Sequence, residues 1–307
     1  MQTTTAALSF VSPTSVQLRF ELGAVVEAVQ TTDLPTGARI DEEDNWVWKD
    51  GGWIGRVGGR EDQIFMPVDT FLPSEIGDLF DWTDVNGTLR APVDTLGDWS
   101  VLVNGQEVAA TGISRKSNII DTAETGWFTF DFRTLENVFL ELDTPLRKGD
   151  RIEVRFDDPD FPVLTARFTP ATAISEAIHV NLRGFDPDDG HKVAYLSSWN
   201  GWEVDAATPD GGAGVPVRYA PGTGFEVVDE ATGAVVSSGV FEMAKALEET
   251  TDFSRNYQLT DVLSAEFSEV TTPGTYHVRV EGVGRSQSFE IRDDHWSSLF
   301  DVAFSGF

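Results

Sequence analysis

The sequence contains no cysteine, which excludes disulfide bonds and thiolate metal ligands. No run of apolar residues approaches the roughly 18 that a membrane-spanning helix needs, so we expect no membrane span. Residues 1–5 lack the basic and apolar segments of a signal peptide. Basic residues are scarce, 22 against 51 acidic ones, which gives a formal net charge of −29. Because phosphate repels such a surface, we expect no nucleic-acid partner.

Signals of catalysis are also missing. The sequence has no Gly-x-Ser-x-Gly elbow, and its four histidines, which lie at positions 179, 191, 277 and 295, show no zinc-binding spacing. A glycosidase needs two carboxylates that face each other across a sugar, but among 51 acidic residues any spacing can be found. We therefore assign no catalytic residue.

What the sequence does contain is a β-strand pattern. Val16, Leu18 and Phe20 alternate with polar residues, and residues 99–103 and 106–108 flank an Asn-Gly turn, which is typical of a hairpin. The 14 prolines and 28 glycines separate many short apolar runs. The pattern predicts an all-β chain of two tandem β-sandwiches of immunoglobulin or fibronectin type, with a boundary near 170–176.

The first predicted sandwich covers residues 5–170, with separate strands at 128–132 and 138–142. Its alternation fails at about 31–92, where we expect long loops or short hairpins. This insert contains Trp46, Trp48 and Trp53, which either stack on a sugar or cover the end of the sandwich or the domain junction.

The second predicted sandwich covers residues 176–292, with one or two helical turns at 241–249. The expected strands are 177–182, 191–197, 224–229, 234–240, 257–259, 263–268, 274–281 and 285–292. A Gly-rich loop is expected at 198–224, in which Trp199 and Trp202 either anchor the loop or contact a neighbouring domain. Residues 293–307 predict the start of an amphipathic helix, with Trp296, Leu299 and Phe300 near one side.

Charged clusters give two further hypotheses. Asp186, Asp188 and Asp189 supply the hard oxygen ligands that Ca²⁺ prefers, although the pattern favours a solvated acidic turn over a calcium site. Calcium is the only cofactor that the sequence suggests. The basic step at residues 115–117 either forms local salt bridges, pairs at the domain interface or contacts an acidic sugar.

The second half of the chain resembles the immunoglobulin-like module that precedes the catalytic domain of family 9 glycoside hydrolases, the cellulase family. Leu182 stands where the family usually has glutamine. The motifs that support the resemblance occur in the family order: Ile-His-Val-Asn-Leu-Arg-Gly-Phe-Asp-Pro at 178–187, Lys-Val-Ala at 192–194, Phe-Glu-Val-Val-Asp-Glu-Ala-Thr-Gly at 225–233, Pro-Gly-Thr-Tyr-His-Val-Arg-Val at 273–280 and Ser-Gln-Ser-Phe-Glu-Ile at 286–291.

The resemblance implies a secreted enzyme that hydrolyses β-linked glucans with inversion. Trp296, Leu299, Ala303 and Phe307 fit the opening helix of the family's catalytic barrel, whose Asp-Ala-Gly-Asp segment has no counterpart here. The expected role is therefore a non-catalytic N-terminal region, which positions a catalytic domain in cis through Trp199, Trp202, Trp296, Leu299 and Phe300. Two alternatives remain open, a polysaccharide-binding module that uses the tryptophans of the first domain and an extracellular surface or assembly protein.

Overall fold

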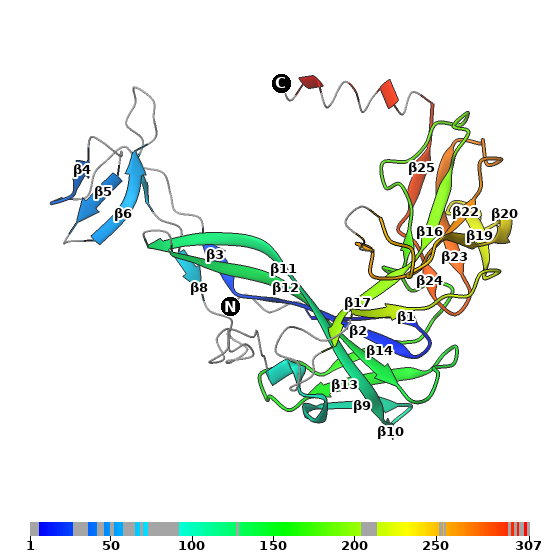
Figure 1. The fold of residues 1–307 in the computed structure, drawn as a ribbon, viewed down its shortest axis with the longest axis horizontal. Helices are drawn as coiled ribbons and strands as arrows, with labels where there is room; N and C mark the ends of the chain where they lie inside the picture. The colour runs from blue at the N-terminus through cyan, green and yellow to red at the C-terminus, as the bar shows by residue number, and fades with distance from the viewer. Residues whose placement is uncertain are drawn as a thin grey trace. The chain divides into compact units, whose positions relative to one another are not determined.

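The computed structural model (Figure 1) describes residues 6–26, 36–41, 46–49, 52–57, 65–67, 70–72, 92–126, 129–203, 214–251, 254, 256–293, 296–297, 300 and 304–305. Its regular elements are strands, as the sequence predicts, together with two short 3-10 turns, η1 (Pro92–Asp94) and η2 (Leu96–Asp98). The chain divides into two compact units. The first comprises 1–6, 20–78 and 117–136, and the second comprises 7–19, 79–116 and 137–307.

The first unit contains two small antiparallel sheets of its own. One has the strand order β4-β5-β6-β7 and the other pairs β3 with β8. The predicted insert at 31–92 therefore contains short hairpin strands where it is described. Their bounds are β3 (Ala24–Val26), β4 (Arg39–Asp41), β5 (Trp46–Lys49), β6 (Gly52–Val57), β7 (Phe65–Pro67) and β8 (Thr70–Leu72).

The largest sheet has six strands, in the order β1-β2-β12-β11-β17-β18. The segments 128–132 and 138–142 were predicted as separate strands, but residues 129–132 and 138–142 belong to the single strand β12. The predicted loop at 198–224 contains two strands instead. The bounds are β1 (Ala7–Ser12), β2 (Ser15–Leu22), β11 (Ala110–Gly126), β12 (Thr129–Leu142), β17 (Ser198–Glu203) and β18 (Gly214–Val217).

A second sheet, β10-β9-β13-β14, contains the predicted hairpin. Asn104 and Gly105 both have positive φ, 54° and 80°, which is the backbone of a tight two-residue hairpin turn. Phe10 of β1 meets Phe168 edge to face at 5.1 Å, so apolar side chains fill the space between the sheets. The bounds are β9 (Trp99–Val103), β10 (Gln106–Val108), β13 (Arg151–Phe156) and β14 (Leu164–Arg167).

The motif-bearing half of the chain forms two further sheets. One has the order β15-β16-β22-β21, and the other has the order β20-β19-β23-β24, with β25 also paired to β23. Their shared core contains Phe185, Phe267 and Phe289, whose ring centroids lie 5.5–5.6 Å apart. The bounds are β15 (Ile178–His179), β16 (Val193–Leu196), β19 (Gly224–Asp229), β20 (Val235–Val240), β21 (Glu242–Lys245), β22 (Val262–Glu266), β23 (Gly274–Val280), β24 (Gly284–Arg285) and β25 (Phe289–Ile291).

Two predictions of local structure in this half were wrong. The segment 241–249, predicted to be helical, contains β21, which pairs with β22 at a sheet edge. The residues 257–259, predicted as a strand, lie in a turn where Leu259 has φ 56°. The helix predicted at 293–307 stays a prediction, because only scattered residues of that stretch are described. Among the described residues, no helix is long and apolar enough to cross a membrane.

The sheet continues from β11 to β17, so residues on either side of the predicted boundary share one hydrogen-bonded ladder. Ser114 pairs with Glu203, and Arg115 pairs with Trp202. The register of β17 against β18 shifts between Trp199 and Trp202, as at a β-bulge. Gly201 lies in this irregular stretch with φ +88°, and a Cβ atom there would approach the Arg115 carbonyl oxygen to 2.1 Å. Only glycine fits this crossing without moving a backbone.

We therefore expect Gly201→Ala to destabilise the fold by more than the roughly 1–2 kcal/mol that a left-handed residue costs. The measurement is chemical unfolding of the full chain. Gly222→Ala is the matched control, because Gly222 has φ +90° but no atom within 4 Å of its would-be Cβ. Equal losses in the two variants would show that the close approach of β17 to β11 contributes nothing.

Candidate functional site

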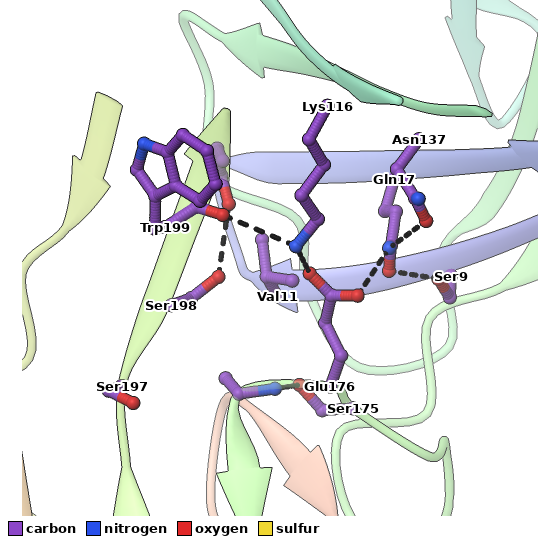
Figure 2. A network of polar contacts seen from close by, with 12 residues as sticks. Ser9, Val11, Gln17, Lys116, Asn137, Ser175, Glu176, Ser197, Ser198 and Trp199 are labelled. Carbon is purple, nitrogen blue, oxygen red and sulfur yellow. Dashed lines mark hydrogen bonds and ion pairs between the residues drawn. The ribbon is translucent and has the colours of Figure 1, made fainter. Parts of the chain in front are cut away.

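A polar network lies where strands β1, β2, β11 and β12 approach the segment that leads into β15 (Figure 2). Its centre is Glu176, whose Oε1 accepts from Lys116 Nζ at 2.5 Å and whose Oε2 accepts from Gln17 Nε2 at 2.7 Å. We call Ser9, Gln17, Lys116, Asn137 and Glu176 the junction network. One carboxylate thereby joins two strands of the six-stranded sheet to the start of the motif-bearing half.

Each partner of Glu176 is held by further contacts. Gln17 is 3% exposed, and its amide is fixed by Ser9 Oγ, which donates to Oε1 at 2.8 Å, and by Asn137 Oδ1, which accepts from Nε2 at 3.0 Å. Lys116 Nζ also donates to the carbonyl of Trp199 at 3.3 Å and lies 5.0 Å from the centre of the Phe139 ring. The network is therefore preorganised around one arrangement of the charged pair.

A second group of hydrogen bonds lies around Asn200. This side chain is fully buried, and its Nδ2 donates to Ser15 Oγ at 2.9 Å and to Glu141 Oε1 at 3.1 Å. Ser15 also donates to Glu141 at 2.7 Å, while Ser198 donates to Asn200 Oδ1 at 3.0 Å. Burial raises the pKa of Glu141 above its ordinary value, and the hydrogen bonds from Ser15 and Asn200 oppose that rise.

Two further buried contacts strengthen the same junction. The hydroxyl of Tyr219 donates to the carbonyl of Val11 in β1 at 2.6 Å, and burial raises the pKa of Tyr219 well above its usual range. Thr260 Oγ1 donates to the carbonyl of Ser198 at 2.9 Å. Because these groups are buried, each would be costly to leave without a partner. The junction therefore has one well-defined geometry.

A groove of about 680 Å³ opens beside the junction network. Gln17, Lys116 and Glu176 form part of its wall, and most other lining residues have hydroxyl, amide or charged side chains. This volume lies in the range of small-molecule sites, roughly 300–1,000 Å³. The arrangement can hold a polar ligand through groups that both donate and accept hydrogen bonds.

The loop at 186–190 is bound by the ammonium group of a lysine, Lys192. Lys192 is fully buried, and its Nζ donates to the carbonyls of Pro187 at 2.8 Å and Asp189 at 2.9 Å. Asp189 Oδ2 accepts from the backbone N–H of Asp186 at 2.9 Å, while Asp188 is exposed. Within the described residues, no group of three or more His, Cys, Asp or Glu side chains is arranged to hold a metal ion. Calcium binding at Asp186, Asp188 and Asp189 stays a prediction.

The tryptophans of the predicted sugar platform lie on β5 and β6. The backbone register pairs Trp48 with Trp53 and Trp46 with Arg56, and the side chains lie outside the described part of the structure. Sugar binding by these residues stays a prediction.

The residues predicted to face a catalytic domain are dispersed. Trp199 and Trp202 lie on β17, where Trp202 pairs with Arg115 of β11. Trp296 is 50% exposed and donates from Nε1 to Asp189 Oδ1 at 3.1 Å, and Phe300 is 66% exposed. Leu299 lies outside the described residues. A contact of these residues with a further domain stays a prediction.

Sequence reasoning missed most of the junction. Gln17 lies between Val16 and Leu18 in an alternating strand, a position that predicts a solvent-facing side chain. Glu176 and Asn200 have no motif around them. The basic step gave the only signal, because Lys116 pairs with Glu176 while its neighbour Arg115 pairs with Asp94 at 2.9 Å. An isolated basic pair in an acidic chain was thus the one pointer to a buried partner.

The raised pKa of Glu141 predicts a pH effect. The folded state binds this proton more tightly than the unfolded state does. Stability from Glu141 is therefore complete below the unfolded value of 4.5 and is lost as pH rises through the folded pKa. Glu141→Gln retains an acceptor without the charge. The free energy of unfolding of this variant, minus that of the native chain, should increase between about pH 4 and pH 7. Glu107→Gln, on exposed β10, controls for net charge, and a pH-independent difference for Glu141→Gln would contradict the prediction.

Lys192→Met should destabilise the motif-bearing half by about 2–4 kcal/mol, because it removes charge-assisted hydrogen bonds and leaves buried carbonyls without donors. Thermal and urea unfolding of the full chain measure this loss. Lys245→Met is the control, since Lys245 donates to Gln258 at 2.8 Å in an exposed contact, and we expect a change within about 0.5 kcal/mol. A similar small effect at both positions would show that the loop does not depend on Lys192.

Comparisons with known proteins find a match for most of the motif-bearing half. Residues 173–285 match the family model described as the cellulase N-terminal ig-like domain. None of the curated proteins matched the chain.

The chain is also similar to parts of larger solved structures. A GH9 protein of Bacteroides ovatus is 24% identical, with a TM-score of 0.29, over 42% of this chain and 18% of that protein. A metagenome-derived glycoside hydrolase family 9 endoglucanase is 26% identical, with a TM-score of 0.25, over 37% and 17%. A thermostable endoglucanase of Alicyclobacillus acidocaldarius is 14% identical, with a TM-score of 0.27, over 40% and 16%. The chain thus spans less than a fifth of these proteins, and its residues 173–285 match the cellulase N-terminal ig-like domain family.

Proposed function

We propose that this chain is the non-catalytic N-terminal region of a secreted, family 9-like glycoside hydrolase, which supports and orients a catalytic domain that degrades β-glucan. The match of residues 173–285 to the cellulase N-terminal ig-like domain supports this proposal. The catalytic domain would lie in cis, and Trp296 and Phe300, both half exposed or more, are the candidate contacts toward it.

The observation that favours a positioning role is the junction itself. Glu176 is bound from two strands at once, and β17 extends the sheet that contains β11. A flexible linker would allow the earlier residues of the second unit to move independently of the matched domain. Hydrogen bonds and a shared ladder restrain residues 17 and 114–116 of that unit against the segment around 176 and 202–203, which suits a support for a neighbouring domain.

The test joins the chain through Phe307 to the catalytic domain of a family 9 endoglucanase. We expect slower thermal inactivation of β-glucan hydrolysis than for the catalytic domain alone. Glu176→Gln should reduce that protection, because it leaves the ammonium of Lys116 without its charged partner.

The matched control is Glu153→Gln, which neutralises another partly exposed carboxylate that pairs with a cation, Arg155, within β13. Two results would contradict the proposal. One is a fusion no more stable than the catalytic domain alone. The other is hydrolysis of β-glucan by the isolated chain, measured as new reducing ends, which would make the chain an enzyme itself.

A further inference from the structure

We propose that the groove beside the junction network binds an uncharged oligosaccharide. This binding activity is separate from the positioning role proposed above, and only the choice of a glucan as first probe rests on that role. The groove encloses about 680 Å³, and every residue that lines it belongs to the described second unit.

The hydrogen-bonding groups of the groove suit hydroxyl-rich ligands. Gln258 and Gln287 contribute exposed amides, which donate and accept at the same time, as a sugar hydroxyl does. Gln258 and Gln287 are exposed at the rim, whereas Gln17 is held inside by Ser9, Asn137 and Glu176. A ligand can therefore meet adaptable amides at the mouth and a fixed polar wall deeper in.

The charge of the groove favours a neutral ligand. The whole chain has 51 acidic and 22 basic residues, yet among the residues that the structure describes Glu176 is the only acidic one that lines the groove. Its carboxylate is engaged by Lys116, so this pair presents little net charge. Arg19 is the other cation of the lining. One surplus cation is a weak attraction for a polyanion on a chain with a net charge of −29.

Apolar side chains complete the wall. Leu182 is 62% exposed and Ile174 is 42% exposed, and both line the groove. Leu182 is also the residue that departs from the family pattern of glutamine at this position. Exposed aliphatic groups beside convergent amides match a ligand that has both C–H faces and hydroxyl edges, as a pyranose ring does.

Isothermal titration calorimetry of the full chain tests this proposal with three neutral probes, cellohexaose, xylohexaose and maltohexaose, and one charged probe, trigalacturonic acid. We expect at least one neutral hexaose to bind with a dissociation constant of about 1 mM or below, unchanged by added NaCl. Binding of xylohexaose or maltohexaose without cellohexaose would support the groove while contradicting the glucan substrate of the proposed function.

Two variants locate the binding in the groove. Gln287→Ala and Leu182→Ala should each weaken binding about threefold to tenfold, because they remove a hydrogen-bonding amide and an apolar contact. Gln287 and Leu182 are both exposed, so the two variants should have the same melting temperature as the native chain. Gln106→Ala, on exposed β10, is the matched control and should leave binding unchanged.

Three outcomes would overturn the proposal. The first is no heat of binding with any neutral hexaose. The second is binding of trigalacturonic acid alone that disappears with added salt, which would make the groove an anion site. The third is neutral binding that Gln287→Ala and Leu182→Ala leave unchanged, which would place the sugar elsewhere on the chain.

Discussion

The junction within the described second unit is centred on the carboxylate of Glu176. It is partly buried, and both of its oxygens are engaged, one by the ammonium of Lys116 and one by the amide of Gln17. These partners lie 60 and 159 residues away along the chain. One side chain therefore fixes two strands of the six-stranded sheet against the segment that enters the matched domain. Removing the Glu176 carboxylate would leave the partly buried ammonium of Lys116 without its charged partner.

The sheet that crosses from β11 to β17 makes the same junction continuous in the backbone. The bulge at Asn200 and Gly201 serves this crossing in two ways: glycine permits the close approach to Arg115, and Asn200 turns inward to bind Ser15 and Glu141. Backbone hydrogen bonds and side-chain networks thus restrain the same boundary. The strand pattern alone predicts two tandem sandwiches, each with its own sheets. The sheet shared by β11 and β17 is a feature that this pattern does not predict.

The sequence predicted well where local pattern and tertiary structure agree. The all-β class and the Asn-Gly hairpin follow from period-two alternation and turn chemistry. It failed where long-range pairing decides. Residues 241–249 are rich in good helix formers, yet β21 completes a sheet edge beside β22. The junction network could not be predicted, because the contacts of Gln17 and Glu176 are made with residues that are distant in sequence.

A polar junction also differs in kind from an apolar one. Apolar surfaces attract each other over many relative orientations, since the hydrophobic effect has no direction. Hydrogen bonds such as Tyr219 to Val11 and Asn200 to Glu141 form only at one distance and angle. Every other orientation would leave those buried groups without partners. Hydrogen bonds made only in the native geometry offset the cost of burying Glu141 and of partly burying Glu176. The junction therefore favours a single orientation, as the positioning role proposed above requires.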